Sequence, residues 1–365
     1  MKKEEEKKIV NELNNSLVYA MSLGSKELFH SNVWAWLFRY NQDFVKIFFE
    51  NIGADDEIKV TREENDRDIT VWVNGEAYVI ENKFKSLPDK EQLVEYETKL
   101  VDKFKQGVIT GIKKPIWMDE VKNWSFIGYS EIVEKMREIA SNIKDDKGSV
   151  IKEYVEILDK SLLLIEGFEF TIGDNWVVKN DETEEWLKML DSVRLADVCQ
   201  KLQADRFVEY IKKQDAFKKY IDNTAKYGWE LVARPDFSHK TGLVDVMCYK
   251  YANSSGTGRR KRQIIAAIGI QIQDKSYKKI MMMNNSASDI YEKSVNVGWL
   301  SEKWSDERKK VSRQKDSRFK QYDQHGGNFF IYHDWEINEK ERSFVCLWEK
   351  MSKDIKIAID KLSSL

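Results

Sequence analysis

The chain is poor in the residues that mark several classes of protein. It has three cysteines and three prolines in 365 residues. Cys199, Cys248 and Cys346 lie far apart and belong to no CxxC or Cys/His cluster, so neither a disulfide framework nor a structural zinc site is indicated. No apolar run reaches the length of a membrane span, and the N-terminal MKKEEEKK lacks the apolar core of a signal peptide. We therefore expect a cytoplasmic protein with no membrane partner.

Charge and length set broad limits. The chain has 60 Lys and Arg against 62 Asp and Glu, a formal net charge of -2. Because this balance is nearly neutral, any surface that binds a polyanion must be local. The hydrophobic content of 42% and the aromatic content of 12% are typical of a globular protein. The length allows two domains, and we place their boundary near residue 175, giving segments 1–175 and 176–365.

Hydrophobic periodicity and turn signals predict helices and strands in both segments. The C-terminal segment is expected to be an α+β domain that recognises the substrate or a partner. The expected elements are, in chain order, helices in 1–50, strands in 58–84, a helix at 89–106, strands at 114–118 and 124–129, a helix at 130–143 capped by Ser130, helices in 150–222, strands at 229–237, 242–252, 262–273 and 328–337, and a helix at 343–362.

The stretch RDITVWVNGEAYVIENK, residues 67–83, predicts a β-hairpin. The Asn-Gly dipeptide between two alternating runs is the strongest short-range signal for a two-residue type I′ turn. If the residues flanking this turn pair, Asp68 lies opposite Glu81, and Asp66 lies opposite Lys83. Because side chains alternate along a strand, Glu81 and Lys83 share the face of Asp68, and the apolar side chains take the other face.

Opposed carboxylates at this position call for a cation between them. Their Cβ atoms lie about 5 Å apart, and like charges at that distance are destabilising. Mg²⁺ is the obvious candidate, because hard cations bind carboxylate and carbonyl oxygens and retain several waters. Lys83 would place an ammonium beside a metal-bound water and a phosphate, which is the chemistry of phosphodiester hydrolysis. The alternative is a surface hairpin whose polar face is simply solvated.

These residues also carry a family resemblance. Asp68, followed after a strand's length by Glu81-Asn82-Lys83, resembles the signature of the PD-(D/E)xK nuclease superfamily. The residue before Asp68 is Arg67, where the signature has proline. The resemblance covers about residues 20–145. It implies a restriction-endonuclease-like αβββαβ core, in which a mixed sheet is flanked by helices.

The segment QLVEY, residues 92–96, follows the motif and is similar to the QxxxY element of the RecB-like branch. Gln92 and Tyr96 stand at i and i+4, so both face one side of a helix. For Gln92 the alternative is a capping box with Asp89 as the N-cap. Tyr96 could equally be a residue of the core.

The upstream segment ELFHSNVWAWLF, residues 27–38, resembles an E-x-x-H-S element found in a family of RecB-like nucleases. Glu27, His30, Ser31 and Trp34 share one face of the expected helix. By this resemblance, Glu27 is the acidic residue of the first helix that completes a metal site. A lone histidine on a helix is more often a satisfied core residue, and a di-iron bundle would need a second ExxH copy.

The resemblance implies a metal-dependent nuclease that hydrolyses DNA, as an endonuclease or an exonuclease, in defence against foreign DNA or in DNA processing. A homodimer that cuts both strands is compatible with it. The alternative is a catalytically inactive module that binds nucleic acid or protein. No GxxxxGK[ST] motif is present, so no NTPase is built in. The implied roles are metal ligands for Mg²⁺ or Mn²⁺ at Glu27, Asp68, Glu81 and the Asn82 carbonyl, water activation by Lys83, and positioning of DNA or of the lysine by Gln92 and Tyr96.

The second segment offers weaker signals for nucleic-acid binding. A basic loop holds Arg259, Arg260, Lys261 and Arg262, which could grip phosphates or form a solvated hairpin tip. Residues 301–321 have eight Lys and Arg against four Asp and Glu. Base stacking is conceivable for some aromatic residues, although most tryptophans are expected in the core; the candidates are Trp299, Trp304 and Phe319. Asp245 and Gln271 echo the first motif without its second acid and its lysine, so we interpret them as an ordinary antiparallel pair; the alternative is a degenerate second nuclease-like unit.

Overall fold

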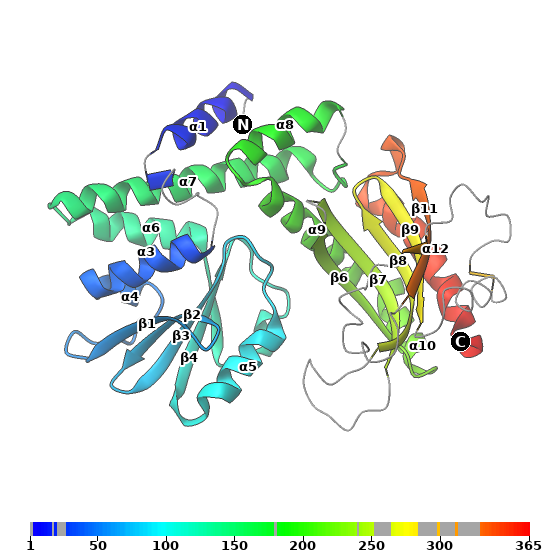
Figure 1. The fold of residues 1–365 in the computed structure, drawn as a ribbon, viewed down its shortest axis with the longest axis horizontal. Helices are drawn as coiled ribbons and strands as arrows, with labels where there is room; N and C mark the ends of the chain where they lie inside the picture. Colours follow the sequence, from blue (N-terminus) through cyan, green and yellow to red (C-terminus); the bar gives the residue numbers. More distant parts are fainter. Residues whose placement is uncertain are drawn as a thin grey trace. The chain divides into compact units, whose positions relative to one another are not determined.

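A computed structural model describes residues 3–16, 18–19, 27–178, 181–238, 241–251, 264–283, 298–299, 311–312 and 329–365. The chain forms two compact units (Figure 1). Unit 1 comprises residues 1–171 and 184–199, and unit 2 comprises residues 172–183 and 200–365. The expected boundary near residue 175 lies close to the first change of unit, whereas the return of residues 184–199 to unit 1 was not expected from the sequence.

Unit 1 contains a five-stranded mixed sheet flanked by helices, in the strand order β1-β2-β3-β4-β5. Strands β1, β2 and β3 are antiparallel neighbours, and β4 and β5 continue parallel to β3. The elements that begin in this unit are α1 (Lys3–Asn15), α3 (Glu27–Tyr40), α4 (Asp43–Lys46), β1 (Ile58–Glu64), β2 (Arg67–Val73), β3 (Glu76–Lys83), α5 (Lys90–Leu100), η1 (Val101–Lys103), β4 (Phe104–Gly111), η2 (Met118–Glu120), β5 (Trp124–Gly128), α6 (Tyr129–Ser141), α7 (Asp146–Ile172) and α9 (Ala196–Lys213), together with most of α8 (Asp181–Ser192).

The predicted hairpin is confirmed. Asn74 and Gly75 have φ values of 52° and 88°, as the two central positions of a type I′ turn require. The paired register runs from Val73 opposite Glu76 to Ile69 opposite Ile80. Asp66 does not follow this register. Its φ is 67° and its carboxylate lies 3.3 Å from Lys99 Nζ, so the expected pairing of Asp66 with Lys83 is wrong.

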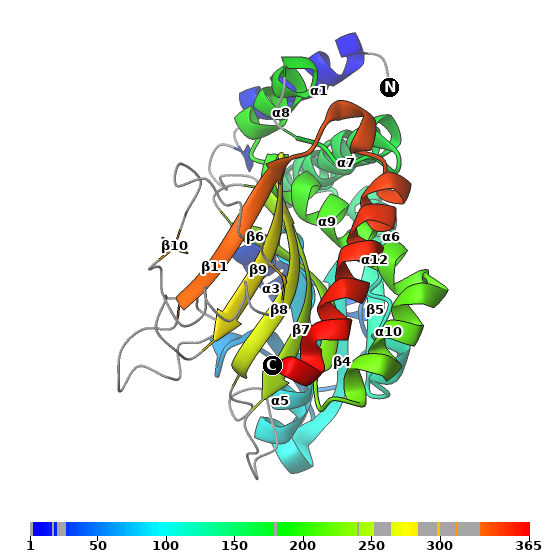
Figure 2. The ribbon, with the colours of Figure 1, turned by 90° about the vertical axis from the view of Figure 1, so that its right-hand side faces the viewer.

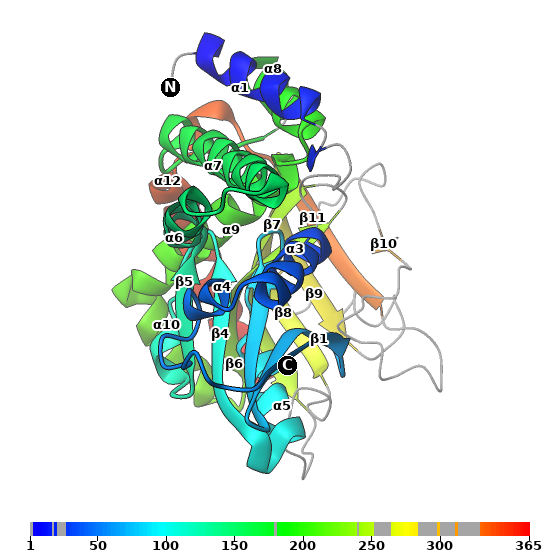
Figure 3. The same cartoon turned by 90° about the vertical axis from the view of Figure 1, so that its left-hand side faces the viewer.

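Helices cover both faces of the sheet. Helix α3 packs against β1, β2 and β3 on one face (Figure 3). On the other face, Leu93 and Tyr96 of α5 pack against Val79 of β3 and Ile109 of β4. The Asp68 face of the hairpin is therefore covered by α5, and the alternative of a simply solvated polar face is wrong. Any charged group on β3 that points toward α5 must be paired or neutralised.

The strand expected at 114–118 is absent, and the structure forms β4 earlier, at Phe104–Gly111. Helix α5 ends at Leu100 rather than near residue 106. Two glycines lower the β-strand propensity of the β4 sequence. The first of them, Gly107, is required by packing. A Cβ at Gly107 would lie 2.3 Å from the ring of Trp124, its partner in β5. Residues 114–118 instead lead into the short helix η2.

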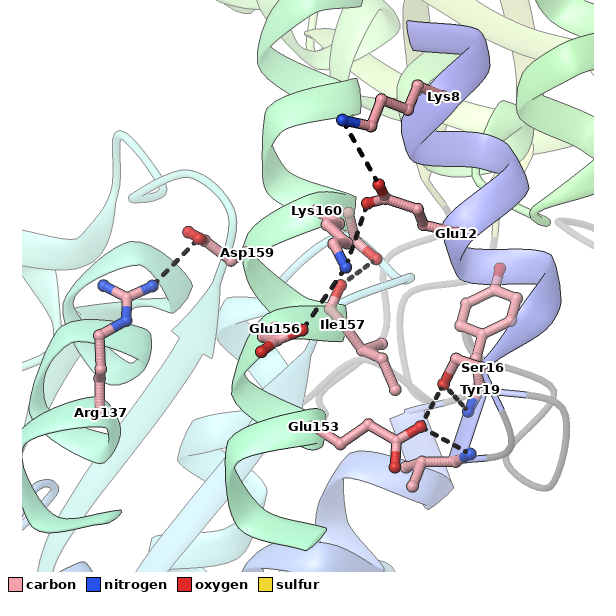
Figure 4. A network of polar contacts seen from close by, with 12 residues as sticks. Lys8, Glu12, Ser16, Tyr19, Arg137, Glu153, Glu156, Ile157, Asp159 and Lys160 are labelled. Atoms are coloured by element: carbon pink, nitrogen blue, oxygen red, sulfur yellow. Dashed lines mark hydrogen bonds and ion pairs between the residues drawn. The ribbon is translucent and has the colours of Figure 1, made fainter. Parts of the chain in front are cut away.

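Helix α6 begins one residue earlier than expected. Gly128 is its N-cap, so Ser130 lies inside the first turn rather than at the cap. Polar contacts tie α1 and α6 to the long helix α7 (Figure 4). Lys160 of α7 lies 3.2 Å from Glu12 of α1, and an ion pair links α6 to α7. Exposed ion pairs contribute little individually, so buried apolar residues such as Leu13, 1% exposed, hold this layer together.

Unit 2 contains a six-stranded sheet in the order β10-β11-β9-β8-β7-β6, in which all described pairs are antiparallel. Helices α10 and α12 pack on one face of this sheet (Figure 2). Its remaining elements are α10 (Asp215–Ala225), β6 (Glu230–Ser238), β7 (Thr241–Tyr251), β8 (Ile264–Gln273), β9 (Ser276–Met283), β10 (Val311–Ser312), β11 (Phe329–Glu336), η5 (Glu339–Glu341), α12 (Phe344–Lys361) and η6 (Leu362–Ser364).

The main strands and the terminal helix expected in the second segment are thus present. None of the helices in the described part of the chain combines the length and the apolar character that a bilayer span requires.

Candidate functional site

Asp68 and Glu81 are the next residues after the last registered pair of β2 and β3. The side chain of Asp68 is half-buried, and its Oδ2 accepts a hydrogen bond of 2.7 Å from the backbone N–H of Asn82. Glu81 is 2% exposed. The negative charge of Asp68 is close enough to raise the pKa of Glu81. The sheet therefore brings the two predicted carboxylates together, one at the surface and one beneath it.

Lys83 is the cation of the site. Its Nζ lies 2.7 Å from Glu81 Oε1, and the Lys83 and Glu81 side chains are 11% and 3% exposed. The pair is therefore almost fully removed from water, where a charge-assisted hydrogen bond is strong but desolvation is costly. The sequence predicted that Lys83 and Glu81 share a face, and the structure places them in direct contact.

Glu81 is held in an environment that disfavours its charge. Burial raises the pKa of Glu81 to about 7, although Lys83 lowers it; Asp68 raises it further. Glu81 Oε2 is buried and has no hydrogen-bond partner in the described part of the chain. The Tyr96 hydroxyl interacts with the Glu81 carboxylate and lowers its pKa, and it also donates to the carbonyl of Asp66 at 2.5 Å. Apart from this interaction with Tyr96, Glu81 Oε2 has no donor in the described part of the chain.

Helix α5 begins as its sequence predicts. Asp89 is the N-cap, and its side chain accepts a hydrogen bond of 3.0 Å from the backbone N–H of Glu91. Gln92 does not complete a capping box; its Nε2 donates to the Tyr96 hydroxyl at 2.5 Å. Tyr96 is 2% exposed and packs in the core between α5 and the sheet. Gln92 and Tyr96 therefore form one hydrogen-bonded unit that borders Glu81 from the α5 side.

The residues of the E-x-x-H-S element lie on the other side of the sheet. Glu27 begins α3, but its side chain lies outside the described part of the structure. His30 is fully buried, with Nδ1 3.0 Å from the Tyr154 hydroxyl, and burial lowers its pKa to about 3. Its ring packs against Phe84, and Trp34 is buried in the same layer. His30 is therefore a neutral core residue, and the structure does not place it with Asp68 and Glu81.

A buried polar cluster behind β3 was not recognised from the sequence. Because successive side chains of a strand point to opposite faces, Asn82 points toward α3, whereas Glu81 and Lys83 point toward α5. The Asn82 side chain is 0% exposed and is bonded to Ser31, Thr110 and Tyr129. The available signals were the asparagine inside an apolar strand and the threonine in GVITG.

The donor set fits a hydrated hard cation. The described residues contain no group of three or more His, Cys, Asp and Glu side chains that could hold a metal ion. Asp68, Glu81 and the Asn82 carbonyl would supply two carboxylates and one carbonyl. Mg²⁺ often binds proteins through one or two carboxylates and keeps several waters. Glu81 Oε2, which has no donor among the described residues beyond the Tyr96 hydroxyl, is the oxygen that such a cation would contact.

The second segment adds no described residue to this site. Arg259, Arg260, Lys261 and Arg262 and the stretches 301–310 and 313–321, including Trp304 and Phe319, lie outside the described residues. Trp299 is 3% exposed and its indole N–H donates to the Ile280 carbonyl at 3.2 Å, so it belongs to the core and is unavailable to stack on a base.

Asp245 and Gln271 are opposed in β7 and β8, as an ordinary antiparallel pair would be. Gln271 Nε2 donates to Asp245 Oδ1 at 2.9 Å, and Asp245 is 0% exposed. The amide of Gln271 therefore faces the buried carboxylate of Asp245, whereas in the first hairpin Asp68 is followed by a second acid, Glu81.

Comparisons with models of protein families, with curated proteins and with solved structures found no match. Functional conclusions about the chain therefore depend on its own residues and their geometry.

Proposed function

We propose that this chain is a metal-dependent nuclease of the PD-(D/E)xK type that hydrolyses phosphodiester bonds of DNA. The observation that carries the proposal is the state of Glu81. It is 2% exposed, one oxygen contacts Lys83, the other has no donor among the described residues beyond the Tyr96 hydroxyl, and a second carboxylate stands beside it. A buried acid with a strongly shifted pKa and a specific charged partner is typical of a functional site.

The order of elements around the hairpin supports the same proposal. Apart from the short helices α4 and η1, the elements α3, β1, β2, β3, α5 and β4 follow in chain order the αβββαβ pattern that the resemblance implies. The strand that completes this pattern is β4 at Phe104–Gly111, rather than the segment expected from the sequence. The helix α5 that carries Gln92 and Tyr96 covers the face of the sheet that holds Glu81.

The residues of the site have distinct tasks in this proposal. Mg²⁺ or Mn²⁺, when bound, would lower the pKa of its water and neutralise charge on the scissile phosphate. Asp68, oriented by the Asn82 N–H, and Glu81 would hold the ion. Lys83 is oriented by Glu81 and would present its ammonium to the phosphate, where a fixed positive charge stabilises the charge that develops during hydrolysis.

A cleavage assay tests the proposal. Supercoiled plasmid and single-stranded DNA are incubated with Mg²⁺, Mn²⁺, Ca²⁺ or EDTA, using wild type, Asp68→Asn and Lys83→Met. Lys105→Met is the matched control, because Lys105 also pairs with a glutamate on β3, Glu76 at 3.2 Å, but at the opposite end of the strand. We expect cleavage with Mg²⁺ or Mn²⁺, a loss of about 100-fold or more in the two site variants, and wild-type activity in the control.

The rival function is a nucleic-acid-binding or protein-interaction module without catalysis. DNA binding by wild type with no cleavage in any metal, and with no Mn²⁺ binding by calorimetry, would establish that rival. Cleavage that persists unchanged in both Asp68→Asn and Lys83→Met would refute this site even if the protein is a nuclease.

A further inference from the structure

The residue between Glu81 and Lys83 is held from behind by three hydroxyl groups. Asn82 Oδ1 accepts from the Tyr129 hydroxyl at 2.5 Å and from Thr110 Oγ1 at 3.3 Å. Asn82 Nδ2 donates to Ser31 Oγ at 3.1 Å. These four residues come from α3, β3, β4 and α6 and are 0% or 1% exposed. The amide is thus bonded to three separate elements of unit 1 inside a dry layer.

The backbone of Asn82 is also held on both strand edges. Its N–H donates to Asp68 Oδ2 at 2.7 Å, and on the other side Asn82 is registered opposite Thr110 in the parallel strand β4. The side-chain bonds resist rotation of this residue about the strand axis, and the backbone contacts resist sliding. Any rotation at Asn82 would move the carbonyl of Asn82 and would also turn Glu81 and Lys83 out of their face.

We propose that Asn82 is a positioning residue: held by Ser31, Thr110 and Tyr129, it sets the metal-binding geometry of Glu81 and of the Asn82 carbonyl. This inference rests on the proposed function. It assigns a role to Ser31 of the E-x-x-H-S element. Ser31 would act on the metal site indirectly, through its hydrogen bond to Asn82 on the α3 face of β3. Partners that orient a metal ligand typically change metal affinity or activity by about 10- to 100-fold when they are removed.

A purely structural cluster would behave differently. In that alternative, the hydrogen-bonded polar groups would specify one packing of the core and have no effect on the metal site. In that case, removing one hydroxyl would lower the melting temperature and leave the affinity for the metal unchanged. The two readings are separated by measuring metal affinity and thermal stability in the same variants.

The variants remove single hydroxyls and keep the packing. Tyr129→Phe and Thr110→Val each delete one donor to Asn82, whereas Thr110→Ser keeps the hydroxyl and serves as the rescue. Tyr154→Phe is the matched control, because its hydroxyl is buried in the same layer but contacts His30 Nδ1 at 3.0 Å rather than Asn82. Mn²⁺ affinity is measured by calorimetry without DNA, and the half-saturating Mg²⁺ concentration is measured in the cleavage assay.

We expect Tyr129→Phe and Thr110→Val to raise the Mn²⁺ Kd and the half-saturating Mg²⁺ concentration by about 10-fold, with kcat largely restored at saturating metal. Thr110→Ser and Tyr154→Phe should match wild type in both quantities. Unchanged Mn²⁺ affinity in both deletion variants would overturn the positioning role while leaving the proposed function intact. A wild-type protein that binds no Mn²⁺ would overturn the proposed function and this inference with it.

Discussion

The stability of unit 1 should depend on pH through two buried groups whose pKa values are shifted in opposite directions. His30 lies on the buried face of α3, and burial lowers its pKa from 6.5 to about 3. Glu81 lies beneath α5, and burial raises its pKa from 4.5 to about 7, although Lys83 lowers it. A shift of one pKa unit corresponds to about 1.4 kcal/mol of unfolding free energy.

The contribution of His30 to stability falls as the medium is acidified. The unfolded chain takes up a proton at His30 as pH falls through 6.5, whereas the folded chain does so only near pH 3. The unfolded state therefore binds more protons in this window, and stability declines as pH falls. The full shift corresponds to about 5 kcal/mol, of which about 2 kcal/mol is lost between pH 7.5 and pH 5.

Glu81 has the opposite effect. The folded chain keeps a proton on Glu81 up to about pH 7, whereas the unfolded chain releases it at 4.5. Stability therefore rises as pH falls through this window, because the cost of ionising a buried acid disappears. The full shift corresponds to about 3 kcal/mol, and about 2 kcal/mol is gained between pH 7.5 and pH 5. In wild type the two contributions nearly cancel.

Single variants should expose each contribution. Urea unfolding is followed by tryptophan fluorescence in EDTA at pH 7.5 and pH 5.0. Relative to wild type, His30→Asn should gain about 2 kcal/mol on going to pH 5, and Glu81→Gln should lose about 2 kcal/mol. Asparagine keeps a polar group where His30 Nδ1 meets Tyr154. Other titrating groups are common to the three proteins and cancel in the comparison. An identical pH response in all three proteins would refute the assigned burial of both groups.

Three further predictions concern the same sheet. Asp68→Asn should raise the free energy of unfolding in EDTA by up to about 1 kcal/mol, seen as a higher melting temperature. The reason is that it removes a charge that repels Glu81 and keeps an acceptor for the Asn82 N–H. Mn²⁺ at 100 times its Kd should stabilise wild type by about 2.7 kcal/mol and leave Asp68→Asn unchanged, as differential scanning fluorimetry will show. Gly107→Ala should cost about 1 to 3 kcal/mol by urea unfolding, since its Cβ would enter the Trp124 ring; a variant as stable as wild type would contradict this packing.

The hairpin was predictable because its signals are local. A two-residue turn sets the register, and alternation along each strand then assigns every side chain to a face, so Asp68, Glu81 and Lys83 follow from their spacing. Strand β4 was not predictable in the same way. Its glycines weaken the local preference for a strand, and Gly107 is present because of Trp124, seventeen residues further along the chain. Contacts of that kind are decided by the tertiary fold.

The polar cluster shows why the residues on only one face of β3 could be predicted from the sequence. Ser31, Asn82, Thr110 and Tyr129 lie on four elements, and no spacing rule relates them. Their polarity is informative only once β3 is known to be covered on both faces, because buried polar groups must then find partners. On the α3 face Asn82 does, through three hydroxyls, although His30 Nε2 in the same layer has no partner among the described residues. On the α5 face Glu81 Oε2 has no donor in the described part of the chain beyond the Tyr96 hydroxyl. The two faces of β3 therefore differ in charge: the α3 face holds the neutral amide of Asn82, whereas the α5 face holds the carboxylate of Glu81, which is the group that the proposed metal ion would contact.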